Sequence, residues 1–168
     1  MDAPRARAGD SGPALVHWMG IADANAAGNV HGGTIMKLCD EAAGLAAIRH
    51  SRSRVVTAAV DRMTFLVPVL VGELVAFHAT VNAVWSTSME VGVRVEAENP
   101  RTGEVRHTNS AYFTMVALDA DGRPAPVPPV DASTPEAIRR QSDAQARRAT
   151  RLAERDTLRA ARAAEERG

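Results

Sequence analysis

The residues best suited to chemistry lie close together, between positions 25 and 41. An amide side chain, Asn29, precedes a His-Gly-Gly turn, and two neighbouring carboxylates, Asp40 and Glu41, follow it. A carboxylate can take a proton from water, and an amide can hold that water or the carbonyl group that it attacks. This combination suits hydrolysis by a general base, provided that a fold brings the groups together.

The turn His31-Gly32-Gly33 opens a segment that is predicted to be helical from about Gly33 to His50. Glycines let a ligand approach the backbone N–H groups. Those groups and the helix dipole favour a developing negative charge, such as the oxyanion of an attacked carbonyl. An ordinary helix start is the alternative: His31 then forms a helix-start hydrogen bond, and Asn29 occupies a turn that needs a positive φ. Both interpretations stay open.

The predicted helix separates the two carboxylates by about 100°. Asp40 lies at the border of the apolar arc, where a half-buried carboxylate can act as a general base; a surface acid paired with Lys or Arg is the alternative. Glu41 lies on the polar face and is interpreted as such a surface acid. The apolar arc consists of Ile35, Met36, Leu38, Cys39, Ala42, Ala43 and Ala46.

Strand-like segments surround this helix. Residues 15–19 predict a short first strand, and 22–33 a loop. After the helix, residues 55–66, 75–83, 87–99 and 105–118 alternate between apolar and polar positions or are rich in β-branched residues, and turns separate them. The sequence therefore predicts an α+β fold in which a curved antiparallel sheet wraps around one long helix. Exposed edge strands of such a sheet favour dimerisation.

Composition limits the remaining possibilities. The 168 residues have a formal net charge of zero, and no apolar run is long enough to span a bilayer. We therefore expect no nucleic-acid or membrane partner, no signal peptide and, with Cys39 as the one cysteine, a cytoplasmic location. Residues 1–13 read as a disordered lead-in, 14–132 as one domain, and 133–168 as a charged helical extension with nine Arg and six acidic residues, capped by Ser133 or Thr134.

Other chemistries find little support in the sequence. There is no Gly-x-Ser-x-Gly elbow and no Walker loop, the five histidines lack metal-ligand spacing, and Cys39 falls in the apolar arc, which favours packing. A basic cluster follows the helix, at Arg49, His50, Arg52 and Arg54. It is either a phosphate-binding group or a solvated helix end.

The combined motif resembles a known family. The segment 24–41, then Val56-Thr57-Ala58 with Asp61, Phe65 and Pro68, and finally Thr87-Ser88-Met89-Glu90-Val91, is similar to the cytosolic acyl-CoA hydrolases and their bacterial single-domain relatives. The resemblance covers residues 15–130 and implies the hotdog fold. It also implies hydrolysis of acyl-CoA to a fatty acid and CoA, without a metal or redox cofactor.

The resemblance also implies where the site lies. Family members pair an Asn from the loop of one hotdog with an Asp from the long helix of another. The matching residues are Asn29 and Asp40, with the N–H groups near His31, Gly32 and Gly33 polarising the carbonyl. A homodimer, assembled as a trimer of dimers into a hexamer, is expected. Candidates for CoA contacts are Ser86, Thr87, Ser88 and Arg54, unless they are simply solvent-facing. A non-catalytic acyl-CoA sensor and an enoyl-CoA hydratase or dehydratase remain alternatives.

Overall fold

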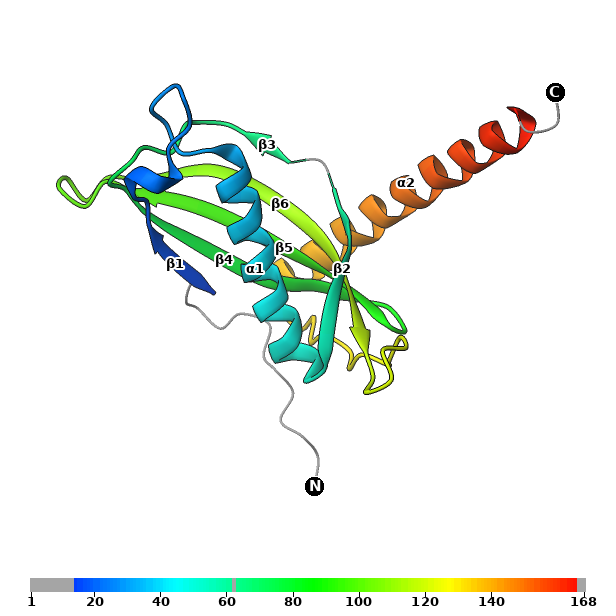
Figure 1. Cartoon of the computed structure of the whole chain (residues 1–168). Helices are drawn as coiled ribbons and strands as arrows, with labels where there is room; N and C mark the ends of the chain where they lie inside the picture. The colour runs from blue at the N-terminus through cyan, green and yellow to red at the C-terminus, as the bar shows by residue number, and fades with distance from the viewer. Residues whose placement is uncertain (1–13, 62, 166–168) are drawn as a thin grey trace. The chain divides into compact units, whose positions relative to one another are not determined.

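The computed structural model describes residues 14–61 and 63–165 (Figure 1). Its elements are, in chain order, β1 (Leu15–Trp18), the 3-10 helix η1 (Ile21–Asp23), α1 (Gly32–Ser51), β2 (Arg54–Val60), β3 (Thr64–Phe65), β4 (Leu74–Val84), β5 (Ser88–Glu98), β6 (Val105–Leu118) and α2 (Pro135–Glu165). The chain divides after Asp131 into two compact units. The lead-in predicted for residues 1–13 lies outside the described residues.

The first unit is one antiparallel sheet curved around α1 (Figure 1). The strand order is β1-β4-β5-β6-β2, and β3 pairs with β6 beyond the end of β2. The long hairpins β4–β5 and β5–β6 form the centre of the sheet, while β1 and β2 form its two edges. This arrangement confirms the predicted fold of a curved sheet around one long helix.

One predicted strand is wrong in its extent. The segment 55–66 was expected to be continuous, but β2 ends at Val60 and β3 starts at Thr64. The reason is register: Val60 pairs with Phe113 and Thr64 with Ser110, so four steps along this chain oppose three along β6. The surplus residue cannot join the ladder, and the strand is interrupted there.

Small side chains on α1 let the sheet approach the helix closely. Ala42, Ala43 and Ala47 are fully buried, together with Cys39, and they face the inward row of β5, namely Met89, Val91, Val93, Val95 and Ala97. The predicted apolar arc was too wide at one side, because Met36 is 46% exposed. Because these side chains are small, the helix and the sheet pack closely and the core is dense even though α1 contributes few large apolar residues.

The second unit consists mainly of α2. Thr134 caps it as expected, since its Oγ1 accepts a hydrogen bond from the N–H of Ala137 (3.1 Å). Ion pairs at helical spacing follow, between Arg140 and Glu136 and between Arg139 and Asp143. Within the described residues, neither α2 nor any other helix is long and apolar enough to cross a membrane.

Candidate active site

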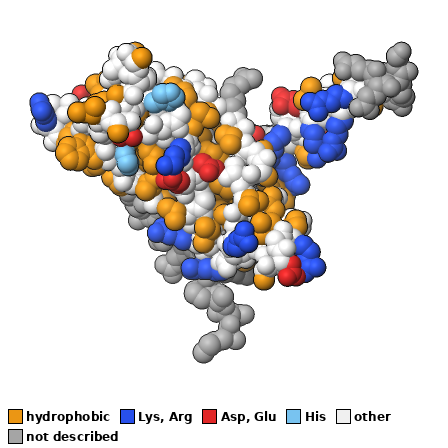
Figure 2. All heavy atoms as spheres, in the orientation of Figure 1, with side chains coloured by type: hydrophobic (Ala, Val, Ile, Leu, Met, Phe, Trp, Pro, Cys, Tyr) orange, Lys and Arg blue, Asp and Glu red, His pale blue; other side chains and the backbone are white. Residues whose placement is uncertain are grey.

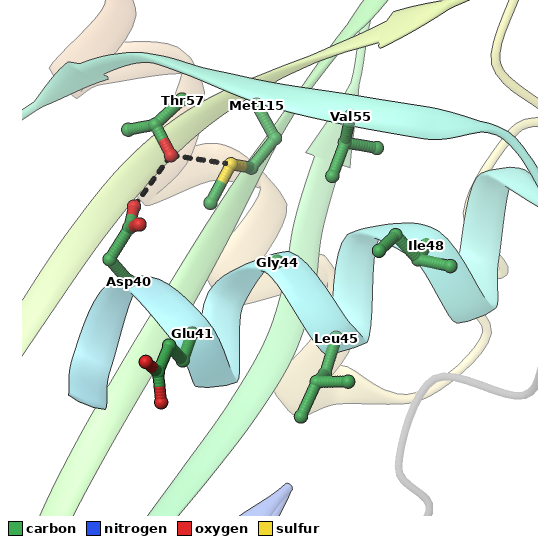
Figure 3. A pocket seen from close by; sticks show the side chains of 8 residues that line it. All are labelled: Asp40, Glu41, Gly44, Leu45, Ile48, Val55, Thr57 and Met115. Carbon is green, nitrogen blue, oxygen red and sulfur yellow. Dashed lines mark hydrogen bonds between the residues drawn. The ribbon is translucent and has the colours of Figure 1, made fainter. Parts of the chain in front are cut away.

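The structure joins Asp40 to a hydroxyl group on the neighbouring strand. Asp40 is the ninth residue of α1 and is half-buried. The Oγ1 of Thr57 on β2 donates a hydrogen bond of 2.5 Å to its Oδ1, and the same oxygen lies 3.4 Å from the Sδ of Met115 (Figure 3). Asp40 makes no ion pair in the described chain, so the alternative of a surface acid paired with Lys or Arg is wrong. Its second oxygen, Oδ2, stays available.

Asp40 and Thr57 lie at the polar end of a pocket of about 420 Å³ between α1 and β2. The pocket is otherwise mostly apolar, being lined by Glu41, Gly44, Leu45, Ile48, Val55 and Met115 (Figure 3). The Glu41 carboxylate points away from Thr57 and pairs with Lys37 at 3.5 Å, which confirms its interpretation as a surface acid. A carboxylate at the mouth of an apolar pocket of this size is a usual setting for a small-molecule site.

The loop before α1 holds two amide side chains in different ways. The Oδ1 of Asn25 accepts hydrogen bonds from the N–H groups of Ala27 (2.9 Å) and Asn29 (3.3 Å). Its Nδ2 group has no hydrogen-bond acceptor among the described residues. Gly28, with φ of 85°, takes the positive φ of this turn, so Asn29 does not serve that purpose. No hydrogen bond within the described residues fixes the Asn29 side chain.

His31 forms the helix-start hydrogen bond that the sequence allowed. It is the N-cap of α1, and its Nδ1 accepts the N–H of Gly33 at 2.9 Å. A side chain at position 33 would place its Cβ only 3.0 Å from this nitrogen, so the cap requires glycine there. The N–H of Gly33 is thereby engaged, whereas that of Gly32 has no acceptor among the described residues. A Cβ added at Gly32 would lie 3.5 Å from the Cζ atom of the Phe65 ring.

A single chain does not bring the amides and the carboxylate together. Asn25 and Asn29 precede α1, whereas Asp40 is eight residues beyond its first residue. At the rise of an α-helix, those eight residues span about 12 Å. Neither amide lines the Asp40 pocket. No contact within the described chain joins either amide to Asp40.

The candidate CoA contacts gather at the end of the sheet where α1 ends. Ser88 and Val56 both pair with Val116 of β6, and Arg54 pairs two residues further on with Leu118. Arg54 and Ser88 therefore share the sheet face opposite to Thr57 and Met115. Ser86 and Thr87 form the turn before β5, and their carbonyls accept backbone hydrogen bonds from Val127 (3.0 Å) and Ala117 (3.0 Å).

Cys39 is buried next to the candidate base Asp40, and its thiol is a poor nucleophile. Burial raises the pKa of its thiol from 9.0 to about 12, while a hydrogen bond with Asn109 acts in the opposite direction and the Asp40 charge adds to the rise. A thiol that stays protonated at neutral pH is a poor nucleophile. Among the residues that the structure describes, no three His, Cys, Asp or Glu side chains are placed to hold a metal ion.

Sequence reasoning missed Thr57 and Asn25 as site residues. Thr57 belongs to the motif that carries the family resemblance, but only the pairing of β2 with α1 shows that its hydroxyl meets Asp40. Asn25 had a local signal, because an Asn three residues before a Gly often accepts backbone N–H groups in a turn. Such hydrogen bonds orient the amide, and the structure shows them between Asn25 Oδ1 and the N–H groups of Ala27 and Asn29.

Comparisons with known proteins fit this geometry. The Thioesterase superfamily matches residues 27–104. A Zymomonas mobilis protein, named as an uncharacterized acyl-CoA thioester hydrolase, is 42% identical over 110 residues, which cover 66% of this chain and 74% of that protein. An apo-hexameric acyl-CoA thioesterase of known structure is 37% identical, with a TM-score of 0.80 over 83% of this chain and 90% of the other.

A third comparison concerns an acyl-CoA hydrolase from Staphylococcus aureus, solved in complex with butyryl-CoA and CoA. It is 29% identical, with a TM-score of 0.76 over 86% of this chain and 90% of that one. Further structures of that enzyme carry alanine in place of an Asn, an Asp or a Thr. There the Asn precedes the Asp by fifteen positions, and the Thr follows the Asp by seventeen.

The helix within a curved sheet and the site beside it define a hotdog-fold thioesterase. The chain belongs to the family of hotdog-fold acyl-CoA thioester hydrolases, as its identity of 42% to the Zymomonas mobilis relative and the coverage of 74% of that protein show.

Proposed function

We propose that this protein hydrolyses acyl-CoA to a free fatty acid and CoA. The observation that carries the proposal is the Asp40 carboxylate, held by the Thr57 hydroxyl at the polar end of a mostly apolar pocket. Such a carboxylate can activate water beside a bound ester of low polarity. The names of the relatives, acyl-CoA thioesterases and hydrolases, support the same substrate class.

The reaction assigns a task to each oxygen of Asp40. Oδ1 is occupied by Thr57, so Oδ2 takes the proton while the water oxygen forms a bond to the thioester carbon. The carbonyl oxygen becomes an oxyanion, and donors must stabilise it. When the C–S bond breaks, the thiolate leaves with the electron pair and the proton on Asp40 is passed to it or to solvent. Attack by Asp40 itself on the carbonyl is the covalent variant of this route.

The amide partner is Asn29 in the prediction from sequence, but spacing and geometry support Asn25. Asn25 precedes Asp40 by fifteen residues and Thr57 follows it by seventeen, the same spacings as in the substituted Staphylococcus aureus enzyme. Asn29 precedes Asp40 by eleven. Moreover, the turn holds the carboxamide of Asn25 through its Oδ1, which leaves Nδ2 as a donor for a carbonyl oxygen. The Gly32 N–H is a second candidate donor. The Gly33 N–H could donate to the substrate only after its hydrogen bond to His31 had broken.

Two copies are needed for each site in this proposal. The amide of one copy would face Asp40 of the other, and a symmetric dimer would contain two equivalent sites. The hexameric form of a solved relative supports further assembly as a trimer of dimers. Ser86, Thr87, Ser88 and Arg54 remain candidates for contacts with CoA. The chemistry uses no metal or redox cofactor, and a cytoplasmic location fits a substrate of this kind.

The proposal is tested by thiol release from a panel of acyl-CoAs. Wild type should release CoA, and Asp40→Asn should lower kcat by about 10³-fold while circular dichroism and Tm stay unchanged. If a folded Asp40→Asn variant keeps near-full activity, the assigned base is wrong. Acyl-CoA binding without turnover by wild type would show a sensor, and hydration of enoyl-CoA without thiol release would show a hydratase.

A further inference from the structure

The helix side of the Asp40 pocket is made of two rows of residues, and each row runs into an arginine. Residues four apart stack along one side of a helix. One row is Asp40, Gly44 and Ile48, and four positions further stands Arg52, the C-cap residue directly after the helix; the other row is Glu41 and Leu45, and its next member is Arg49. The two arginines therefore continue the pocket past its apolar part, toward the end of α1.

The side chains of both arginines are exposed to solvent. Neither makes an ion pair or a side-chain hydrogen bond with any residue of the described chain. In Figure 2, Lys and Arg side chains gather at the lower end of this face, where α1 ends in Figure 1. A helix C-terminus attracts cations in general, so position alone does not decide between a structural and a binding role.

The backbone of Arg52 adds an independent observation. With φ of 56° and ψ of 26°, it is the one non-glycine residue with positive φ in the described chain. Glycine is the usual residue at this position after a helix, because a side chain is disfavoured there. An arginine in a conformation that glycine would adopt more easily is a backbone outlier, and such an outlier is a reason to test its side chain for a function.

The spacing fits one ligand. From Asp40 to Arg52 there are twelve residues, or about 18 Å along the helix. Roughly thirteen bonds separate the thioester sulfur of CoA from its first phosphorus; at about 1.2 Å per bond for an extended chain, that arm measures about 15 Å. A thioester carbonyl beside Asp40 would thus bring the diphosphate within reach of the Arg52 and Arg49 guanidinium groups, which bind phosphate oxygens in a bidentate manner.

We infer that the pocket between α1 and β2 holds the pantetheine arm of CoA and that Arg49 and Arg52 bind its phosphates. The inference rests on the proposed function and adds to it the direction in which the substrate lies. Gly44 has a defined part: nothing lies within 4 Å of the place where its Cβ would be, so this position leaves the pocket open for the arm.

Steady-state kinetics with two substrates test the inference. Arg49→Ala combined with Arg52→Gly should raise KM for an acyl-CoA by about tenfold or more, with a kcat close to wild type and a weaker dependence of KM on salt. The same variant should act like wild type on the matching acyl-pantetheine, which lacks the phosphates. Arg101→Ala, an equal loss of charge in the β5–β6 hairpin at the opposite end of the sheet, is the control and should change neither KM.

The following results would each overturn part of the inference. An unchanged KM for acyl-CoA, or equal losses on both substrates, would overturn the phosphate role. Gly44→Val should raise KM for every acyl-CoA regardless of chain length; a loss confined to long acyl chains would place the fatty acid in the pocket instead. Wild type that hydrolyses neither thioester would refute the proposed function itself, whereas active wild type with unaffected variants would refute only this inference.

Discussion

The two sides of the candidate site are stabilised in different ways. On the carboxylate side, Asp40 of α1 depends on Thr57, seventeen residues later in the chain and on another element. On the amide side, the side chains of Asn25 and His31 accept hydrogen bonds from N–H groups two to four residues away, while the backbone of the same loop pairs with Val69 and Leu70. The position of the Asp40 carboxylate thus depends on a side-chain contact between distant elements, whereas the orientation of the Asn25 carboxamide depends on contacts within its own turn. Neither side contains the whole candidate site, and the proposed function joins the two sides by pairing two copies of the chain.

The largest expected effect tests whether the two sides come from different copies. Asp40→Asn and Asn25→Ala should each be nearly inactive alone, with kcat lowered by about 10²- to 10³-fold. When the two are mixed and refolded together, half of the dimers should pair one of each and contain one intact site. Activity should then recover to about a quarter of wild type. Native mass spectrometry that shows mixed oligomers without recovery would mean that both groups act within one chain.

A second prediction distinguishes the two amides of the loop. Asn25→Ala removes an oriented donor and should lower kcat by about 10²-fold, whereas Asn29→Ala should lower it less than about threefold. Rates of thiol release under saturating substrate measure this, and Tm values for both variants control for the loss of the turn. The reverse order of effects would restore Asn29 as the functional amide.

A third prediction concerns the link between α1 and β2. Thr57→Val has nearly the same shape but removes the donor to Asp40, so kcat should fall by about tenfold. Thr57→Ser keeps a hydroxyl and should recover most of the activity. Equal activity in the valine variant would show that Asp40 is positioned without this hydrogen bond.

The smallest expected effect lies in the core directly behind the site. Because burial raises the pKa of Cys39 from 9.0 to about 12, the folded protein keeps this thiol protonated at pH 9, whereas about half of an unfolded thiol is ionised there. Iodoacetamide at pH 9 should therefore label the protein in urea but not in buffer, as mass spectrometry would show. Rapid labelling of active, folded protein would contradict the packing role.

The sequence predicted those features that depend on local pattern. The period of two in residues 87–99 located β5, and the Gly-rich turn and apolar arc located α1 to within one residue at each end. The helical angle of Asp40 identified it as a carboxylate at the border of the core. These predictions succeeded because periodicity and capping act over a few residues.

Features that depend on register could not be predicted in the same way. The break between β2 and β3 arises from a mismatch in residue count against β6, which no local pattern contains. The contact of Thr57 with Asp40 likewise follows from where α1 crosses the sheet. For the amide, two asparagines four residues apart were available, and only hydrogen bonds within the turn show which one is oriented.

The row of alanines on α1 has a consequence for how this protein tolerates change. Ala42, Ala43 and Ala47 are fully buried between helix and sheet, so we expect a larger side chain there to push the two apart. The same displacement would lengthen the hydrogen bond between Thr57 and Asp40, because Asp40 belongs to the helix and Thr57 to the sheet. Substituting larger residues at these positions should therefore lower the rate of turnover before it unfolds the chain. Activity should then respond to a change in core volume more sensitively than Tm does.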